Sequence, residues 1–404
     1  MTKYNTATLP NGLRVIHLPS PSPVVYCGIG INAGSRQEAE GQEGVAHFCE
    51  HVTFKGTRRR SALQILNCLE SVGGDLNAFT NKEDTVFYAA VMREHLPRAV
   101  DLLTDIVFCS EYPEQEIQHE LDVICDEIES YNDSPAELIY DEFENLLFQG
   151  HPLGHNILGS RERVQTFTSA HACHFTQRYY RPDNAIFFAY GDVDFSRLLK
   201  MLDAAGPYPP DLGQPPLPPV VTPQASARET SPHHQAHVML GCRAYSYDDP
   251  RRMPLCLLNN MLGGPGMNAR LNLSLRERHG LVYTVESTMV SYSDTGLWSV
   301  YFGCDHHDVR RCLRLVHREL DRFMQHPLSE RQLAAAKRQL KGQLTIACDN
   351  REQFALDIAK HFLHYGQERS IDDLLLRIDA ITADQIQQVA QDLFAPSHLQ
   401  LLTL

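Results

Sequence analysis

Alternating and β-rich segments open each half of the chain, and helical patterns follow them. Short apolar segments rich in β-branched residues, typical of strands, lie at residues 13–18, 24–31 and 237–242. Each half also ends in the same way, with a helical pattern that runs into a proline-containing turn and an apolar terminal strand, at 179–188 and at 393–402. This parallel predicts two copies of one α+β unit, each a mostly antiparallel mixed β-sheet packed with helices.

A proline-rich stretch marks the predicted boundary between the two copies. The runs GPYPP at 206–210 and PPLPP at 215–219 lack most backbone donors and favour extended polyproline geometry. We therefore predict a first domain at 1–206, a semi-rigid linker at 207–225 and a second domain at 226–404.

Composition narrows the class of protein. A chain of 404 residues that is 43% hydrophobic can bury a core in each of two domains. A net charge of −14 argues against nucleic acid as the main partner, and the basic triplet at 58–60 is interpreted as a solvated loop. Eleven cysteines without a Cys-x-x-Cys pair indicate reduced thiols. No signal sequence or apolar run that could span a bilayer is recognisable, so we expect a cytoplasmic protein with no membrane span.

One five-residue stretch carries metal chemistry. At about 100° per residue, His51 lies about 40° from His47 on a helix, and Glu50 lies about 60° to the other side. Two neutral imidazoles four residues apart can hold zinc, and a neighbouring carboxylate can accept a proton from a water molecule. The order His-x-x-Glu-His is that of the inverzincins. A chain with 20 histidines can also contain such a pair by coincidence.

A third zinc ligand is expected from the acidic helix predicted at 114–131. Glu120 and Glu127 are seven residues apart in it and therefore face the same way. One carboxylate could bind the metal while the other orients a ligand from behind. Spacing alone does not choose between them, and a solvated acidic face is an equally good interpretation.

The combination of His47, Glu50 and His51 with Glu120 and Glu127 resembles the zinc peptidase family that includes pitrilysin, insulysin and the mitochondrial processing peptidase. The resemblance implies that Glu127 is the third zinc ligand and that Glu120 is its supporting acid. It implies a zinc endopeptidase with one ion per catalytic domain. Cys49 stands where many relatives carry Leu, and we interpret it as a buried, inert thiol.

The resemblance extends to segments that would bind substrate. Asn77, Ala78, Phe79 and Thr80 resemble the family's exposed strand edge beside the zinc, to which an extended peptide adds as a further strand. In the second half, the turn LGGPGMN at 262–268 is followed by Arg276 and Tyr283, similar to the pair that engages the substrate and its oxyanion. An Arg at a helix end is otherwise usually a surface residue.

The resemblance also implies a mechanism and an assembly. Zinc would acidify a water molecule, and Glu50 would remove its proton and later pass it to the leaving amine. Family enzymes enclose peptide substrates in a chamber of four such units, whereas this chain has two. We therefore expect a homodimer, or alternatively a heterodimer with a homologue of similar size.

Two other functions remain open at this point. The first is a non-catalytic core subunit of the same fold, although such relatives typically lose part of the zinc motif. The second is a dedicated peptidase that removes a leader from one precursor with a heterologous partner.

Overall fold

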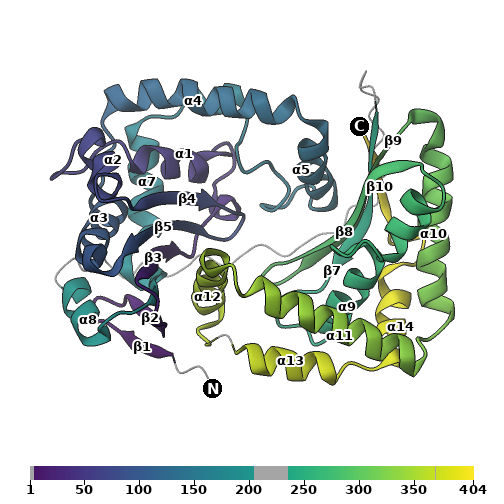
Figure 1. Cartoon of the computed structure of the whole chain (residues 1–404). Coiled ribbons are helices and arrows are strands. Elements are labelled where there is room, and N and C mark those ends of the chain that lie inside the picture. Colours follow the sequence, from purple (N-terminus) through teal and green to yellow (C-terminus); the bar gives the residue numbers. More distant parts are fainter. Residues whose placement is uncertain (1–3, 204–234, 369) are drawn as a thin grey trace. The chain divides into compact units, whose positions relative to one another are not determined.

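The computed structural model describes residues 4–203, 235–368 and 370–404, and they form two compact units. As far as the segments are described, unit 1 is built from Met1–Ser130, His155–Pro218 and Ala347–Ser370. Unit 2 is built from Tyr131–Gly154, Pro219–Ile346 and Ile371–Leu404. Each unit contains one β-sheet and its own helices (Figure 1), which is the α+β architecture that the sequence predicts.

The sheet of unit 1 has six strands in the order β1-β2-β6-β3-β5-β4. Strands β2 and β6 pair in parallel and all other neighbours are antiparallel, so the sheet is mixed. The strands are β1 (Asn5–Thr8), β2 (Arg14–Pro19), β3 (Val24–Ile31), β4 (Asp75–Thr80), β5 (Thr85–Met92) and β6 (Ala185–Gly191). Strand β4 is therefore an edge strand.

The sheet of unit 2 has four antiparallel strands in the order β10-β7-β9-β8. They are β7 (Ala236–Ala244), β8 (Val282–Ser291), β9 (Gly296–Cys304) and β10 (Gln400–Thr403). The order matches β6-β3-β5-β4 of unit 1, because in both units a hairpin follows the central strand and the last strand returns to pair with that central strand. This correspondence supports two copies of one unit.

Helices cover both faces of each sheet. Unit 1 contains α1 (Val45–Thr53), α2 (Ala62–Glu70), α3 (Leu96–Cys109), α4 (Glu114–Asn132), α6 (Arg161–Val164), α7 (Ser169–Tyr179), α8 (Phe195–Asp203) and α12 (Arg351–Tyr365), with short helical turns at Ser35–Gln37, Arg93–His95 and Pro182–Asn184. Unit 2 contains α5 (Pro135–Leu147), α9 (Arg252–Gly263), α10 (Val309–Gln325), α11 (Glu330–Ala347), α13 (Ile371–Asp379) and α14 (Ala383–Leu393), with turns at Asn272–Glu277 and His306–Asp308.

One helix of each sequence half belongs to the unit formed by the other half. Helix α12 packs on β3 and β6 of unit 1, whereas α5 packs on β7 and β10 of unit 2. Each exchanged helix follows the long helix of its own half, α4 or α11. The sequence predicted two continuous domains, because periodicity shows which face of a helix is apolar but not which sheet that face covers. The predicted linker at 207–225 lies outside the described residues.

The core of unit 1 lies between its sheet and the helices α1, α3 and α7. Val25, Cys27 and Ile29 of β3 point into this core with Val45 and Phe48 of α1. The odd and even positions of β3 face opposite sides of the sheet. On the opposite face, Arg351 of α12 stacks over the rings of Tyr26 and Tyr190. The sheet is thus buried on both faces, which fixes α1 and its neighbours.

No helix among the described residues is long and apolar enough to cross a bilayer.

A close backbone approach fixes the turn between β4 and β5. Ser35 and Arg36 donate backbone hydrogen bonds to Asn81 O at 3.1 Å and to Lys82 O at 2.8 Å. A Cβ atom on Gly34 would lie 2.0 Å from Asn81 O. Glycine is therefore required at 34 for steric reasons.

We expect Gly34→Ala to lower the free energy of unfolding by about 1 to 3 kcal/mol, because the added methyl must push the turn away. Urea denaturation measures the change. The control is Gly342→Ala in α11, where a Cβ meets nothing within 4 Å, and it should raise stability by up to about 1 kcal/mol. Equal stability of Gly34→Ala and the wild type would contradict the steric argument.

Candidate zinc site

Helix α1 presents two imidazoles on one side. His47 is buried, His51 is half-buried, and their ring centroids are 4.6 Å apart. The helix begins after Gly44, which has a positive φ of 96°. A buried carboxylate, Glu38, accepts hydrogen bonds from the amides of Gly44 at 2.9 Å and Ala46 at 2.8 Å. Glu38 thereby satisfies free amides at the positive end of the helix and fixes its start.

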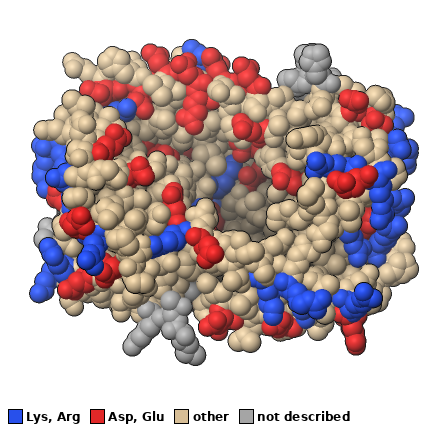
Figure 2. Space-filling model, viewed as in Figure 1, with Lys and Arg blue, Asp and Glu red and all other residues tan. Residues whose placement is uncertain are grey.

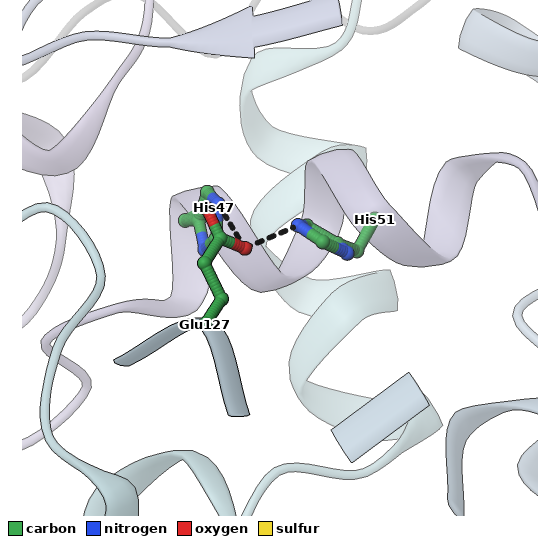
Figure 3. A group of neighbouring side chains, drawn as sticks. All are labelled: His47, His51 and Glu127. Atoms are coloured by element: carbon green, nitrogen blue, oxygen red, sulfur yellow. Dashed lines mark ion pairs between the residues drawn. The ribbon is translucent and has the colours of Figure 1, made fainter. Parts of the chain in front are cut away.

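Helix α4 supplies the carboxylates. Its apolar face, which includes Ile117, Ile124 and Ile128, is buried in unit 1. Its exposed acids include Glu114, Asp122, Asp126 and Glu129. Acidic side chains gather at the top of Figure 2, where Figure 1 places α4. Glu120, in contrast, is buried, and Glu127 is directed at the two histidines (Figure 3). The solvated acidic face therefore exists, but Glu120 is buried and Glu127, although 46% of its side chain is exposed, contacts both histidines.

Three possible ligand atoms meet at one point. Glu127 Oε2 lies 3.3 Å from His51 Nε2 and 3.7 Å from His47 Nε2 (Figure 3). The three ligand atoms all lie within 4.8 Å of one another. A tetrahedral zinc ion with bonds of about 2.0 to 2.1 Å separates its ligand atoms by about 3.3 to 3.4 Å. The side chains therefore fit a zinc ion with only small adjustments.

Glu120 lies behind His51. Its Oε1 is 2.9 Å from His51 Nδ1, and its Oε2 forms an ion pair with Lys55 Nζ. Burial tends to raise the pKa of Glu120, but His51 and Lys55 together lower it below its usual value. An ionised Glu120 accepts a hydrogen bond from Nδ1–H of His51, so that Nε2 is the ring nitrogen directed at Glu127.

The two imidazoles have opposite electrostatic environments. Burial, reinforced by the neighbouring His51, lowers the pKa of His47 to about 4. Burial also acts to lower the pKa of His51, but the carboxylates of Glu120 and Glu127 raise it to about 9. Nδ1 of His47 is buried without a hydrogen-bond partner among the described residues. Only His51 therefore has a carboxylate to orient it.

Glu50 is held between the histidines and the edge strand. Burial raises its pKa above the usual value, although a hydrogen bond opposes the shift. That bond comes from Thr80 Oγ1 of β4, which donates to Glu50 Oε2 at 2.6 Å. A carboxylate with a raised pKa is suited to exchange protons near neutral pH.

Strand β4 directs part of its backbone away from the sheet. Asn81 N–H donates to Asp84 O at 2.8 Å, and Asn77 and Phe79 stand opposite Tyr88 and Val86. Hydrogen-bonded pairs alternate along an antiparallel ladder, so Asn77 and Phe79 use their backbone groups toward β5. Ala78 and Thr80 therefore direct theirs outward, where another strand could add.

Arg276 and Tyr283 lie in unit 2. Arg276 belongs to a π-helical turn, and its guanidinium carbon is 5.6 Å from the ring centroid of Tyr283. Tyr283 is 83% exposed. Arg276 also lines a cavity of about 380 Å³ with the glycine-rich turn at 263–266 and the β8 residues 284–287. The structure thus brings this pair together on an accessible surface.

Cys49, His171 and the group at 305–308 lie outside the cluster of candidate zinc ligands. Cys49 is fully buried, and burial raises the pKa of its thiol well above the usual value, which agrees with an inert residue. His171 Nδ1 lies within hydrogen-bond distance of the amide and hydroxyl of Thr168 before α7. Asp305, His307 and Asp308 are close enough together to share an ion, but they are largely exposed.

Sequence reasoning missed the residues that support the site. The basic triplet at 58–60 is not solvated throughout, because Arg60 is half-buried and pairs with Asp101 and Asp105, whereas Arg58 and Arg59 are exposed. Lys55, just before it, pairs with Glu120. A cluster of basic residues without visible partners gives no signal of such pairing. Glu38 was missed because it acts through the helix backbone.

Comparisons with known proteins identify the family. Residues 14–161 match the model for "Insulinase (Peptidase family M16)", and residues 166–340 match the model for "Peptidase M16 inactive domain". The chain belongs to peptidase family M16. Among its relatives, an uncharacterized zinc protease of Streptomyces coelicolor is 34% identical over 95% of this chain and 86% of its own length.

Other family M16 proteins cover nearly the whole chain. The uncharacterized zinc protease YmxG of Bacillus subtilis is 30% identical over 97% of this chain and 96% of its own. The mitochondrial-processing peptidase subunit beta of Rattus norvegicus is 32% identical over 94% of this chain and 80% of its own length. The crystal structure of a protease from Helicobacter pylori covers 100% of this chain and 99% of its own, with a TM-score of 0.91 and 21% identity, which shows the same fold.

The helix of unit 2 that corresponds to α1 lacks the two histidines, in agreement with the description of the second matched model as an inactive domain. Helix α9 follows the first strand of unit 2, as α1 follows β3 in unit 1, but α9 contains no histidine. The metal-ligand set that includes His47, His51 and Glu127 therefore has no counterpart on that helix.

We expect Glu120→Gln to weaken zinc affinity about 10- to 100-fold, because a neutral amide orients His51 less well and no longer makes its imidazole more basic. Competition with a chromogenic chelator measures this affinity. Asp122→Asn removes a charge from the exposed face of the same helix and should leave the affinity unchanged. Equal losses in both variants would indicate a general effect of helix charge.

Proposed function

We propose that this chain is a zinc-dependent endopeptidase that hydrolyses peptides or unfolded segments. The observation that carries the proposal is the convergence of His47, His51 and Glu127 beside a buried Glu50 that contacts an edge strand. A merely solvated acidic face on α4 would not direct a carboxylate at two imidazoles from another helix. The names of the relatives as zinc proteases add support.

His47, His51 and Glu127 would hold one zinc ion per catalytic unit. The ion would supply Lewis-acid chemistry, in that it polarises a peptide carbonyl and lowers the pKa of water. Glu120 keeps the Nδ1 proton on His51, and Lys55 keeps Glu120 ionised. His51 would then bind the ion through Nε2, which gives up its own proton when the metal binds.

Glu50 serves as general base and then as general acid. Thr80 fixes Oε2 by its hydrogen bond, which leaves Oε1 to accept a proton from the attacking water. Glu50 then delivers this proton to the nitrogen of the leaving amine. Its raised pKa suits both steps, since a very weak base would not take the proton and a strong one would not release it.

The substrate is an extended peptide that binds β4 through its backbone. The outward amide and carbonyl groups of Ala78 and Thr80 can pair with any peptide, and side-chain pockets then set the preference. Thr80 contacts Glu50, so a peptide added along this edge passes the base directly. Asn77 and Phe79 contribute side chains to the other face of the same strand.

The catalytic chamber is completed by a second chain. Family resemblance assigns Arg276 and Tyr283 to the substrate and its oxyanion, and in a homodimer they would serve the zinc site of the partner protomer. A guanidinium and a phenolic hydroxyl can both stabilise a negative oxygen. The alternative is a heterodimer, which is favoured by one relative whose name is that of a subunit.

The other two functions are less well supported. A core subunit without activity has no need for a complete set of ligands and a base. A dedicated leader peptidase would use the same site and differ only in its substrate. A cytoplasmic location remains a prediction from the sequence.

Glu50→Gln should retain zinc while peptide hydrolysis falls by at least about 10²-fold, because the amide cannot accept the proton. Elemental analysis of the purified protein and cleavage of a fluorogenic peptide library measure the two quantities. Wild-type activity should disappear with a chelator and return with added zinc. Full activity of Glu50→Gln would remove this residue from the mechanism.

Mixing inactive chains tests the shared site. If Arg276 acts on the partner's zinc site, Glu50→Gln and Arg276→Ala chains should together regain up to about one quarter of wild-type activity, since one of the two sites in each mixed dimer is intact. Native mass spectrometry gives the amount of mixed dimer. Mixed dimers that show no recovery would contradict the contribution in trans.

A further inference from the structure

The turn between β4 and β5 is unusually well anchored for a hairpin turn. It contains three consecutive charged residues, Lys82, Glu83 and Asp84, and two of them are buried, with 3% of Lys82 and 6% of Asp84 exposed. Hairpin turns usually lie in solvent and vary freely. Charged groups in a buried turn cost free energy unless each has a partner.

Each charged residue of this turn contacts a different segment of unit 1. Lys82 donates to His155 O, in the segment that precedes α6. Glu83 pairs at 2.6 Å with Arg36, whose side chain is fully buried. Asp84 is directed to the opposite side of the sheet, toward α12, so the turn is held from both sides.

The contacts of Asp84 with α12 connect distant parts of the sequence. Asp84 Oδ2 lies 3.2 Å from His364 Nε2, and Oδ1 lies 3.8 Å from Lys360 Nζ. The ammonium of Lys360 is also 4.6 Å from the ring centroid of Phe79 in β4. Within the turn, Asn81 donates to Asp84 Oδ1 at 2.7 Å. Helix α12 therefore contacts both the edge strand and the turn that follows it.

Thr80, the last residue of β4, directly precedes this turn and donates to Glu50. A shift of the turn would move Thr80 relative to Glu50 and would move the outward backbone groups of β4. We propose that Asp84, Lys360 and His364 are positioning residues, which hold the substrate edge in place against the catalytic base. This proposal rests on the endopeptidase function argued above.

The charges explain why three residues act together. Burial removes water from the Asp84 carboxylate and so raises the free energy of its charged form. The contacts with His364 and Lys360 offset this unfavourable free energy. Removal of one partner leaves the carboxylate with the other, whereas removal of the carboxylate releases the turn from both partners. The effect of Asp84→Asn should therefore exceed the effect of either Lys360→Met or His364→Gln.

The local test is hydrogen exchange, followed by mass spectrometry, on the zinc-loaded full-length protein. Asp84→Asn should raise the exchange rate of peptides that cover β4 about 10-fold and leave β2 unchanged. The matched control is Glu352→Gln on the same helix, which neutralises the carboxylate that accepts a 2.9 Å hydrogen bond from Tyr88 of β5 but does not touch the turn. Lys360→Arg keeps the charge and should behave as wild type.

The catalytic test uses the same variants with a long extended peptide. Asp84→Asn should lower kcat/KM about 10-fold with zinc content unchanged, and Lys360→Met should show a smaller loss that Lys360→Arg does not. If Asp84→Asn fails to fold, Lys360→Met and His364→Gln provide the same comparison. Exchange and kcat/KM that match those of Glu352→Gln would overturn the proposal. The wild-type protein could also lack peptidase activity while Asp84→Asn still raises the exchange rate of β4. That result would refute the proposed function and leave the anchoring of the turn intact.

Discussion

The contact between α1 and α4 is the constraint on which the catalytic unit depends. Two imidazoles on one helix and a carboxylate on another must converge to within a few ångströms, and neither helix contains the whole set. Packing of the apolar face of α4 into the core sets the height and rotation of Glu127, while Glu38 fixes where α1 begins. Ordinary helix packing and helix capping thus bring the three candidate metal ligands together.

The surroundings of that contact distribute charge in a consistent way. Glu120 contacts Lys55 through one carboxylate oxygen and His51 through the other. The far nitrogen of His51 lies where a cation would bind. On the other side, Glu50 is buried and accepts a hydrogen bond from Thr80. The two carboxylates therefore differ in environment: His51 and Lys55 lower the pKa of Glu120 below its usual value, whereas burial raises the pKa of Glu50.

Sequence patterns predicted the parts of the structure that depend on local periodicity. The strands at 24–31 and around 237–242, the long acidic helix and the repeated order of elements could all be expected, because alternation and helical spacing report local structure. His47, Glu50 and His51 were recognisable for the same reason, since they lie within one helical turn. The choice of Glu127 over Glu120 came from family resemblance, because both residues face the same way on α4.

Interactions between distant residues could not be predicted in this way. The contact of Asp84 with His364 joins positions 280 residues apart, and no pattern within either segment indicates the other. The same applies to the exchange of α5 and α12, because an amphipathic helix is compatible with any apolar sheet face of suitable shape. Lys55 and Glu38 looked like ordinary surface charges, since their partners are known only once the chain is folded.

The placement of α12 also bears on how the protein forms during synthesis. The sheet of unit 1 is complete when β6 has been made, but the helix that covers one of its faces follows about 160 residues later. Until then, Tyr26, Tyr88 and Tyr190 have no helix over them, and the nascent first half carries an uncovered apolar sheet face. The edge strand β4 and the turn that follows it therefore gain their contacts with α12 only after residues 351–365 have been made.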